Sequence, residues 1–146
     1  MFGGLHIEMT LWTTVGDLLE SSGWTAALTE AEVASSGVAE SFLKASHLTR
    51  TRQAHQVTLL TLSNLKQEAY SHSVGDVDKP PLMTTWESEM CKRSPTFLFW
   101  DMIVSYETLI LTFIRSHREK RFFLFVEVLE KLVHLFFVLD HVNYAR

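Results

Sequence analysis

Two long apolar segments near the end of the chain, residues 96–117 and 122–139, most constrain how this sequence can fold. When residues are placed about 100° apart, as in an α-helix, the polar side chains of each segment fall on one narrow stripe. A helix with so narrow a polar stripe is buried on most of its sides. We therefore expect two core helices, whose short connection of about four residues makes them antiparallel neighbours. The first stripe consists of Asp101, Ser105, Thr108, Thr112 and Arg115, and the second of Glu127, Glu130, Lys131 and His134.

The charges within both segments argue against a membrane-spanning helix. Asp101 and Glu107 lie in the first segment, and four charged or titratable residues interrupt the second. A spanning helix needs about 20 residues with almost no charge. The first eight residues lack the basic start and the apolar run of a secretory signal. We therefore predict an intracellular protein, in the nucleus or the cytoplasm, with no membrane partner.

Length and composition indicate one all-α domain, an irregular helical bundle that ends in the long antiparallel helix pair. The chain has 146 residues, of which 47% are hydrophobic, and this suits a single packed domain. Its one cysteine, Cys91, excludes an internal disulfide and favours a reducing compartment. We divide the domain into an N-terminal helical part (1–70), a loop or linker (71–83) and a C-terminal helical hairpin part (84–146).

Apolar spacing and helix-breaking residues locate the helices of the N-terminal part. Apolar residues recur at steps of three and four from Leu5 to Leu19, which predicts a helix over residues 5–19. A short helix is expected at 25–33 and a break at 35–37. A helical region then covers residues 38–70, with an interruption near 47–52. Residues 57–62 are rich in β-forming side chains, so a strand remains an alternative there.

Two helix-start signals precede the C-terminal helices. Residues 84–87, Thr-Thr-Trp-Glu, have the spacing of a capping box and predict the start of a short helix. Ser94 and Pro95 suit the N-cap and the first position of the following helix, because Ser caps a free backbone N–H and Pro has none to leave unpaired.

Complete catalytic signatures are absent from the sequence. It contains no glycine-rich phosphate loop, no nucleophile elbow and no pair of cysteines, and none of its seven histidines has the HExxH spacing of a zinc site. We therefore predict no catalytic residue and no cofactor, and we favour a protein that is not an enzyme.

Two carboxylates fall on apolar helix faces. Glu8 lies on the apolar face of the first predicted helix, and Glu107 lies opposite the polar stripe of residues 96–117. A buried carboxylate must be paired or its pKa rises, and such groups are frequent at functional sites. One interpretation is a metal site that includes His6, Glu8 and Glu107. The alternative is a hydrogen bond between each carboxylate and a Tyr, Trp or His side chain in the core.

Basic residues cluster in two places, at residues 44–67 and at residues 115–121. Such clusters favour phosphate contacts, although the net charge of −4 is low for a nucleic-acid-binding domain. Residues 1–43 contain six acids and no Lys or Arg, so pairing with these acids explains the first cluster equally well. The candidate contacts to nucleic acid are Lys44, Arg50, Arg52, Arg115, Arg118, Lys120 and Arg121.

Three stretches of the chain together carry a resemblance. They are Phe-Gly-Gly-Leu-His-Ile-Glu-Met at residues 2–9, residues 41–58, and Leu-Asp-His-Val-Asn-Tyr-Ala-Arg at residues 139–146. The sequence resembles uncharacterised, mobile-element-derived open reading frames that occur in many copies in animal genomes. The resemblance implies the C-terminal helical portion of a longer protein with a transposase-like nuclease region upstream. It transfers no catalytic residue to this chain.

Our leading hypothesis is a non-catalytic helical domain or fragment of a mobile-element-derived protein that acts through protein contacts. Its partner is another protein or a missing portion of a longer chain. The first alternative is a nucleic-acid-binding module that uses the two basic clusters. The second alternative is the remnant of a metal-dependent nuclease with His6, Glu8 and Glu107 at its site.

Overall fold

The computed structural model describes the backbone of residues 3–143 and the side chains of residues 4–133, and this part of the chain contains helices and no strand. The prediction of an all-α fold is therefore confirmed. The helices are α1 (Gly3–Leu19), α2 (Trp24–Glu30), α3 (Ser36–Leu43), α4 (Leu48–Val74), α5 (Met83–Arg93), α6 (Pro95–Arg118) and α7 (Phe122–Asn143).

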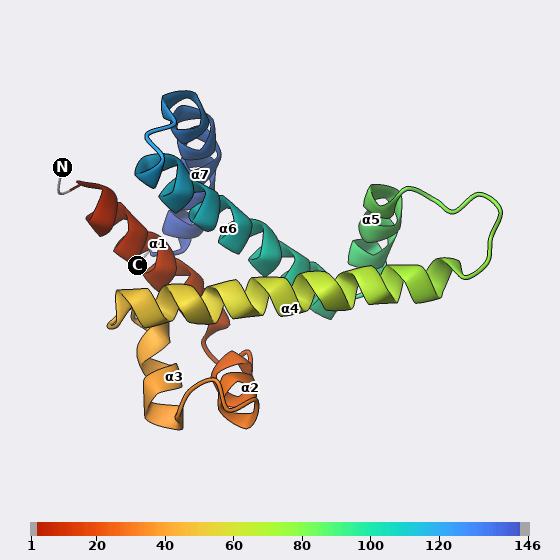
Figure 1. The fold of residues 1–146 in the computed structure, drawn as a ribbon, viewed down its shortest axis with the longest axis horizontal. Coiled ribbons are helices and arrows are strands. Elements are labelled where there is room, and N and C mark those ends of the chain that lie inside the picture. Colours follow the sequence, from red (N-terminus) through yellow and green to blue (C-terminus); the bar gives the residue numbers. More distant parts are fainter. Residues whose placement is uncertain (1–2, 144–146) are drawn as a thin grey trace.

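Helix α6 is the element around which the others assemble, because it contacts α1, α4, α5 and α7. Figure 1 shows α4 as a long rod across the molecule, with α1, α6 and α7 on one side of it and α2 and α3 on the other. By length and composition α6 could cross a membrane, but a core helix meets the same criteria. It contacts four other helices, and 28% of its most apolar 18-residue stretch is buried.

The predicted C-terminal helix pair is confirmed. Three residues separate α6 from α7, and α7 turns back along α6 (Figure 1). Lys120 in this turn has a φ of 54°, in the left-handed region that reverses the chain sharply. The predicted start of α6 is also confirmed, since the Ser94 hydroxyl accepts a hydrogen bond from the Phe97 backbone N–H at 3.1 Å.

The alternative of a strand at residues 57–62 is wrong, because these residues lie within α4. The Thr58 hydroxyl donates to the carbonyl of Ala54, one helical turn earlier, at 2.9 Å. A strand needs a neighbouring strand to pair its backbone groups, and the described part of the chain offers none. Tertiary packing therefore overrides the local β-propensity.

Several predicted helix boundaries are also corrected. Helix α5 begins at Met83 with no side-chain cap, so the predicted capping box at 84–87 is wrong. Prolines 80 and 81 restrict the backbone before the helix, and the chain is extended only as far as Leu82. The expected break at 35–37 is the start of α3, with Ser35 in the extended N-cap conformation. The interruption near 47–52 is a turn at 44–47, and the loop expected at 71–83 covers 75–82.

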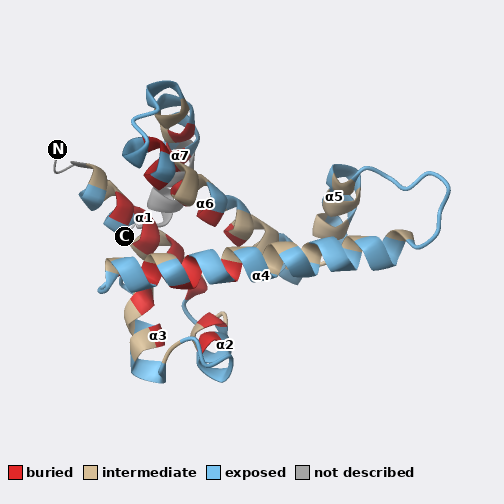
Figure 2. Ribbon diagram, viewed as in Figure 1, coloured by how far each residue is buried: buried red, intermediate tan, exposed pale blue. Residues whose placement is uncertain are grey.

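The core lies where α1, α4 and α6 meet and extends to α2, α3 and the first half of α7 (Figure 2). Its largest fully buried apolar side chains include Trp12, Phe113 and Ile110. The first half of α4 contributes buried residues, whereas α5 contributes none. The core therefore occupies one end of the long helix, and the other end of α4 projects from it.

The packing of α1 against α3 depends on Gly16, because a Cβ atom there would overlap the carbonyl oxygen of Leu43. We expect Gly16→Ala to lower the free energy of unfolding by at least about 2 kcal/mol, since backbone must move to relieve the overlap. Gly37→Ala in α3 is the matched control, because no atom lies within 4 Å of its new Cβ. Urea unfolding of both variants checks this, and equal losses of stability would contradict it.

Candidate functional site

One of the fully buried polar residues is His55 of α4. Its ring is fully buried and lies between two indoles, with centroid distances of 4.2 Å to Trp12 and 4.7 Å to Trp24. The planes are nearly parallel, with interplanar angles of 11° and 20°. In the plane of the ring, Nδ1 lies 2.7 Å from Oε1 of Glu107 on α6, which is also fully buried. Four helices therefore meet at one imidazole.

The spacing of residues on α4 places His55 there. The buried residues of α4 recur at steps of three and four, so they form the one face that meets the core. Glu107 occupies the corresponding face of α6, opposite the polar stripe that the sequence revealed. The buried residues of α4 are Thr51, Ala54, His55 and Thr58.

Burial favours the neutral form of both partners. Desolvation lowers the pKa of His55 from 6.5 to about 3 and raises the pKa of Glu107 from 4.5 to about 8. Near neutral pH, Glu107 is therefore a carboxylic acid whose O–H donates to Nδ1 of a neutral imidazole. The pair shares one acidic proton inside the core and is a hydrogen bond rather than an ion pair.

Three buried polar atoms at this junction have no hydrogen-bond partner among the described residues. They are Nε2 of His55, Oε2 of Glu107 and Oγ1 of Thr51. An unpaired buried polar atom costs about 1–3 kcal/mol, so this arrangement is more expensive than an apolar core. Neither His55 nor Glu107 lines any of the three pockets found along α4.

A second buried carboxylate, Glu8 of α1, lies beside the first pair. Its Oε1 accepts hydrogen bonds from Arg52 Nε at 2.9 Å and Nη2 at 2.6 Å, and one from the Trp12 indole N–H at 3.3 Å. Trp12 thus contacts Glu8 through its N–H and His55 through its ring face. The indole of Trp24 donates in turn to the Thr58 hydroxyl at 2.8 Å. The alternative that both carboxylates bond to Trp or His in the core is confirmed.

The structure does not bring the three expected metal ligands together. Glu8 is neutralised by Arg52, Glu107 bonds to His55, and His6 is exposed on α1. No group of three His, Cys, Asp or Glu side chains suited to a metal ion occurs among the described residues. The side chains of His134, Asp140 and His141 lie outside the described part of the chain.

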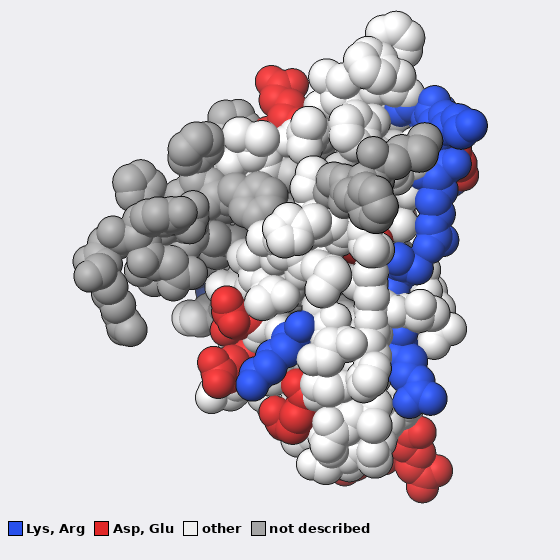
Figure 3. Space-filling model, turned by 90° about the vertical axis from the view of Figure 1, so that its left-hand side faces the viewer, with Lys and Arg blue, Asp and Glu red and all other residues white. Residues whose placement is uncertain are grey.

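The predicted nucleic-acid contacts come from two segments of the chain, and ion pairs with carboxylates engage some of them. Arg52 is held by Glu8, and Arg115 lies 2.8 Å from Glu119. Figure 3 shows a row of Lys and Arg side chains along one edge of one face of the molecule. Within the described residues, four exposed candidates make no ion pair: Lys44 and Arg50 near the start of α4, and Arg118 and Lys120 near the α6–α7 turn.

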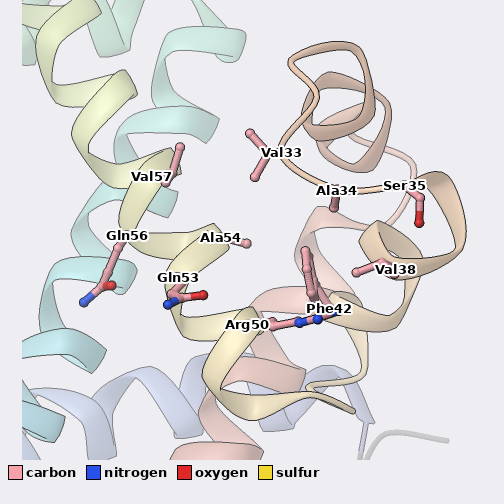
Figure 4. A pocket seen from close by; sticks show the side chains of 10 residues that line it. All are labelled: Val33, Ala34, Ser35, Val38, Phe42, Arg50, Gln53, Ala54, Gln56 and Val57. Atoms are coloured by element: carbon pink, nitrogen blue, oxygen red, sulfur yellow. The ribbon is translucent and has the colours of Figure 1, made fainter.

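An apolar groove that sequence reasoning missed runs along α4. A pocket of about 700 Å³ lies between α4 and the α2–α3 segment (Figure 4). It shares Val33 and Val57 with a second pocket of about 400 Å³, which shares Leu62, Leu65 and Trp100 with a third of about 360 Å³. We call these three connected pockets the α4 trough. The local signal for it was the apolar run at 57–62, which we assigned to a possible strand.

Comparisons with protein-family models, with curated proteins and with solved structures give no match to this chain.

The shared proton of His55 and Glu107 predicts how stability depends on pH. Between pH 4.5 and 6.5 the pair holds one proton in both the folded and the unfolded state, so its contribution is flat. Above pH 6.5 the unfolded state holds none while the folded state keeps one to about pH 8, so stability falls as the pH rises. Below pH 4.5 the unfolded state holds two, so stability falls again toward pH 3.

Glu107→Gln tests this dependence because the amide can donate to Nδ1 but does not titrate. We expect the variant to lose the decline above pH 6.5, which reaches at most about 1.4 kcal/mol per pH unit in the parent chain. Chemical unfolding at a series of pH values measures it. Glu127→Gln at an exposed carboxylate is the control, and an alkaline decline that persists in Glu107→Gln would refute the assignment.

The ion pair of Arg52 with Glu8 leads to a separate prediction. Arg52→Met leaves a buried carboxylate without its cation, so we expect a loss of about 2–4 kcal/mol in the free energy of unfolding. Glu8→Gln combined with Arg52→Met removes the uncompensated charge and restores most of that loss. Thermal unfolding of the parent chain and of the variants, with and without Mn²⁺, distinguishes this ion pair from a metal site. If Glu8 bound a metal ion, Mn²⁺ would stabilise the parent chain and not the Glu8→Gln variant.

Proposed function

We propose that this chain is a non-catalytic helical module that binds another protein segment in the α4 trough. The observation that carries the proposal is the row of apolar side chains that stay accessible along the trough while the core beside it is complete. Val33, Val57 and Leu65 are each about half exposed there. Resemblance to mobile-element-derived open reading frames supports a place within such a protein or its assembly.

The chemistry of the trough favours an amphipathic α-helix as the bound segment. The lining is mainly apolar and comes from α2, α3, α4, α5 and α6, so it accepts side chains that recur at steps of three and four along a helix. Its charged lining residues are Arg50 at one end and Lys66 toward the other, and no Asp or Glu side chain lines the three pockets. Lys66 is already paired with Glu87 at 2.7 Å and with Asp101 at 3.0 Å, so Arg50 is the lining cation that makes no ion pair with a described residue. A helix with apolar anchors and an acidic flank at the Arg50 end therefore complements the trough.

Nucleic acid is the competing partner class, and it is supported by the exposed cations near the α6–α7 turn. Its weakness is that carboxylates already bind Arg52 and Arg115. A metal-dependent nuclease remnant has less support, because each carboxylate that would bind the metal already has another partner.

Leu65→Asp tests the trough, with Leu60→Asp as its matched control. Both leucines lie on α4 with similar exposed fractions, 54% and 64%, but only Leu65 lines the trough. The probe is a library of helical peptides with leucines at steps of three and four and glutamates on the flanks. We expect selected peptides to shift the emission of Trp24 and Trp100, and to bind Leu65→Asp about tenfold or more weakly.

The control decides the interpretation of this experiment. Leu60→Asp should bind the selected peptides as the parent chain does, because its side chain lies outside the trough. Failure of every peptide in the library to bind, or an equal loss of affinity in both variants, would exclude the trough as the binding surface. Unchanged melting of the two variants verifies that neither substitution acts through the fold.

A further inference from the structure

The end of the helical hairpin exposes aromatic side chains that no described contact explains. We define the hairpin tip as residues 115–123, which span the end of α6, the turn and the start of α7. The exposed fractions of Phe122 and Phe123 are 69% and 89%, and Phe123 is the most exposed large hydrophobic residue in the described part of the chain. Their rings touch edge to face, with centroids 6.0 Å apart. Val126, one turn along, is 46% exposed.

Cations lie close to these two rings in the sequence. The tip contains four Lys or Arg residues and one carboxylate, Glu119. Glu119 accepts from Arg115 Nε at 2.8 Å and lies 3.9 Å from Arg121, so it neutralises part of this charge. Arg118 and Lys120 are exposed and make no ion pair with any described residue. The tip therefore has an excess of positive charge around an exposed aromatic pair.

We propose that the hairpin tip binds the surface of an anionic lipid membrane. Two phenyl rings at the end of a helix can enter the boundary between headgroups and acyl chains, which removes their surface from water. The nearby cations then lie at the depth of the lipid phosphates, where the negative surface potential makes the binding free energy of each cation more favourable. The contact is peripheral, so it is compatible with the charges that argue against a spanning helix.

The shape of the tip favours a lipid surface over single-stranded nucleic acid, which shares the preference for cations and aromatic rings. The turn between α6 and α7 lies at the periphery of the molecule (Figure 1). A nucleic-acid strand is held in a groove that follows its backbone, and none of the pockets of the α4 trough includes a tip residue. A deformable lipid surface needs no groove and accepts two exposed rings such as those of Phe122 and Phe123.

The charges farther along α7 limit the contact to the tip. Glu130 lies on the same side of α7 as Phe122 and Val126, two turns from the start of the helix. Glu127 is nearer, but its charge is paired with Lys131 at 2.8 Å. Glu130 makes no ion pair with a described residue and repels an anionic surface, so only the first turn of α7 enters it. This surface is separate from the α4 trough and does not depend on the function proposed for it.

Vesicle sedimentation of the complete chain tests the proposal. The probes are vesicles of phosphatidylcholine alone and of phosphatidylcholine mixed with phosphatidylserine, in low and in physiological salt. We expect binding to the anionic vesicles, weaker binding as salt rises, and little binding to the neutral ones. The double variant Phe122→Ser/Phe123→Ser should bind the anionic vesicles about tenfold or more weakly. These positions are exposed, so its melting should be unchanged.

Matched controls separate this result from general stickiness. Leu60→Ser/Leu82→Ser removes two other exposed apolar side chains, 64% and 75% exposed, and should leave vesicle binding unchanged. Arg118→Glu/Lys120→Glu should abolish the preference for anionic vesicles. Absence of binding, equal binding to neutral vesicles, or full binding by the phenylalanine double variant each overturns the proposal. So does oligothymidylate binding that depends on both phenylalanines while vesicle binding does not.

Discussion

The hydrogen bond between His55 and Glu107 is the contact on which the arrangement of helices depends. It joins α4 to α6 at 2.7 Å, while the rings of Trp12 and Trp24 fix the imidazole from α1 and α2. A buried neutral acid and a buried neutral imidazole satisfy each other only in one relative placement, so the contact selects the register of α4 against α6. If α4 moved by one turn along α6, an apolar pair at this contact would lose little free energy. The imidazole of His55 and the carboxyl of Glu107 would instead both lose their hydrogen-bond partner.

The same junction explains why the surface beside it stays open. α4 uses one face of its first half for the junction, which α2 reaches through Trp24, and α3 also contacts α4. The apolar residues that follow on α4 are only partly covered, and α5 contacts α6 with no buried residue of its own. An incomplete cover over an apolar helix leaves a groove, which is the form of many helix-binding sites.

The sequence predicted most of the helical architecture but little of the site. The narrow polar stripes identified α6 and α7, and the position of Glu107 opposite its stripe correctly predicted a buried carboxylate. Its partner could not be predicted, because His55 lies 52 residues away along the chain, in the basic cluster that we interpreted as a phosphate contact or as a partner of the N-terminal acids. The strand alternative and the capping box were wrong because each rested on a few local residues, whereas packing and the two prolines determined the outcome.

The distribution of burial along α4 has a consequence for how this helix moves. It is a single helix in geometry, but all its buried residues lie between positions 51 and 58, and the turns that follow are largely solvated. Backbone hydrogen bonds in the first half can break only when the whole core opens, whereas those in the second half can break by local fraying. Amide protons would therefore exchange with solvent slowly in the first half and quickly in the second. One continuous helix is thus divided into a part that belongs to the core and a part that responds to whatever binds it.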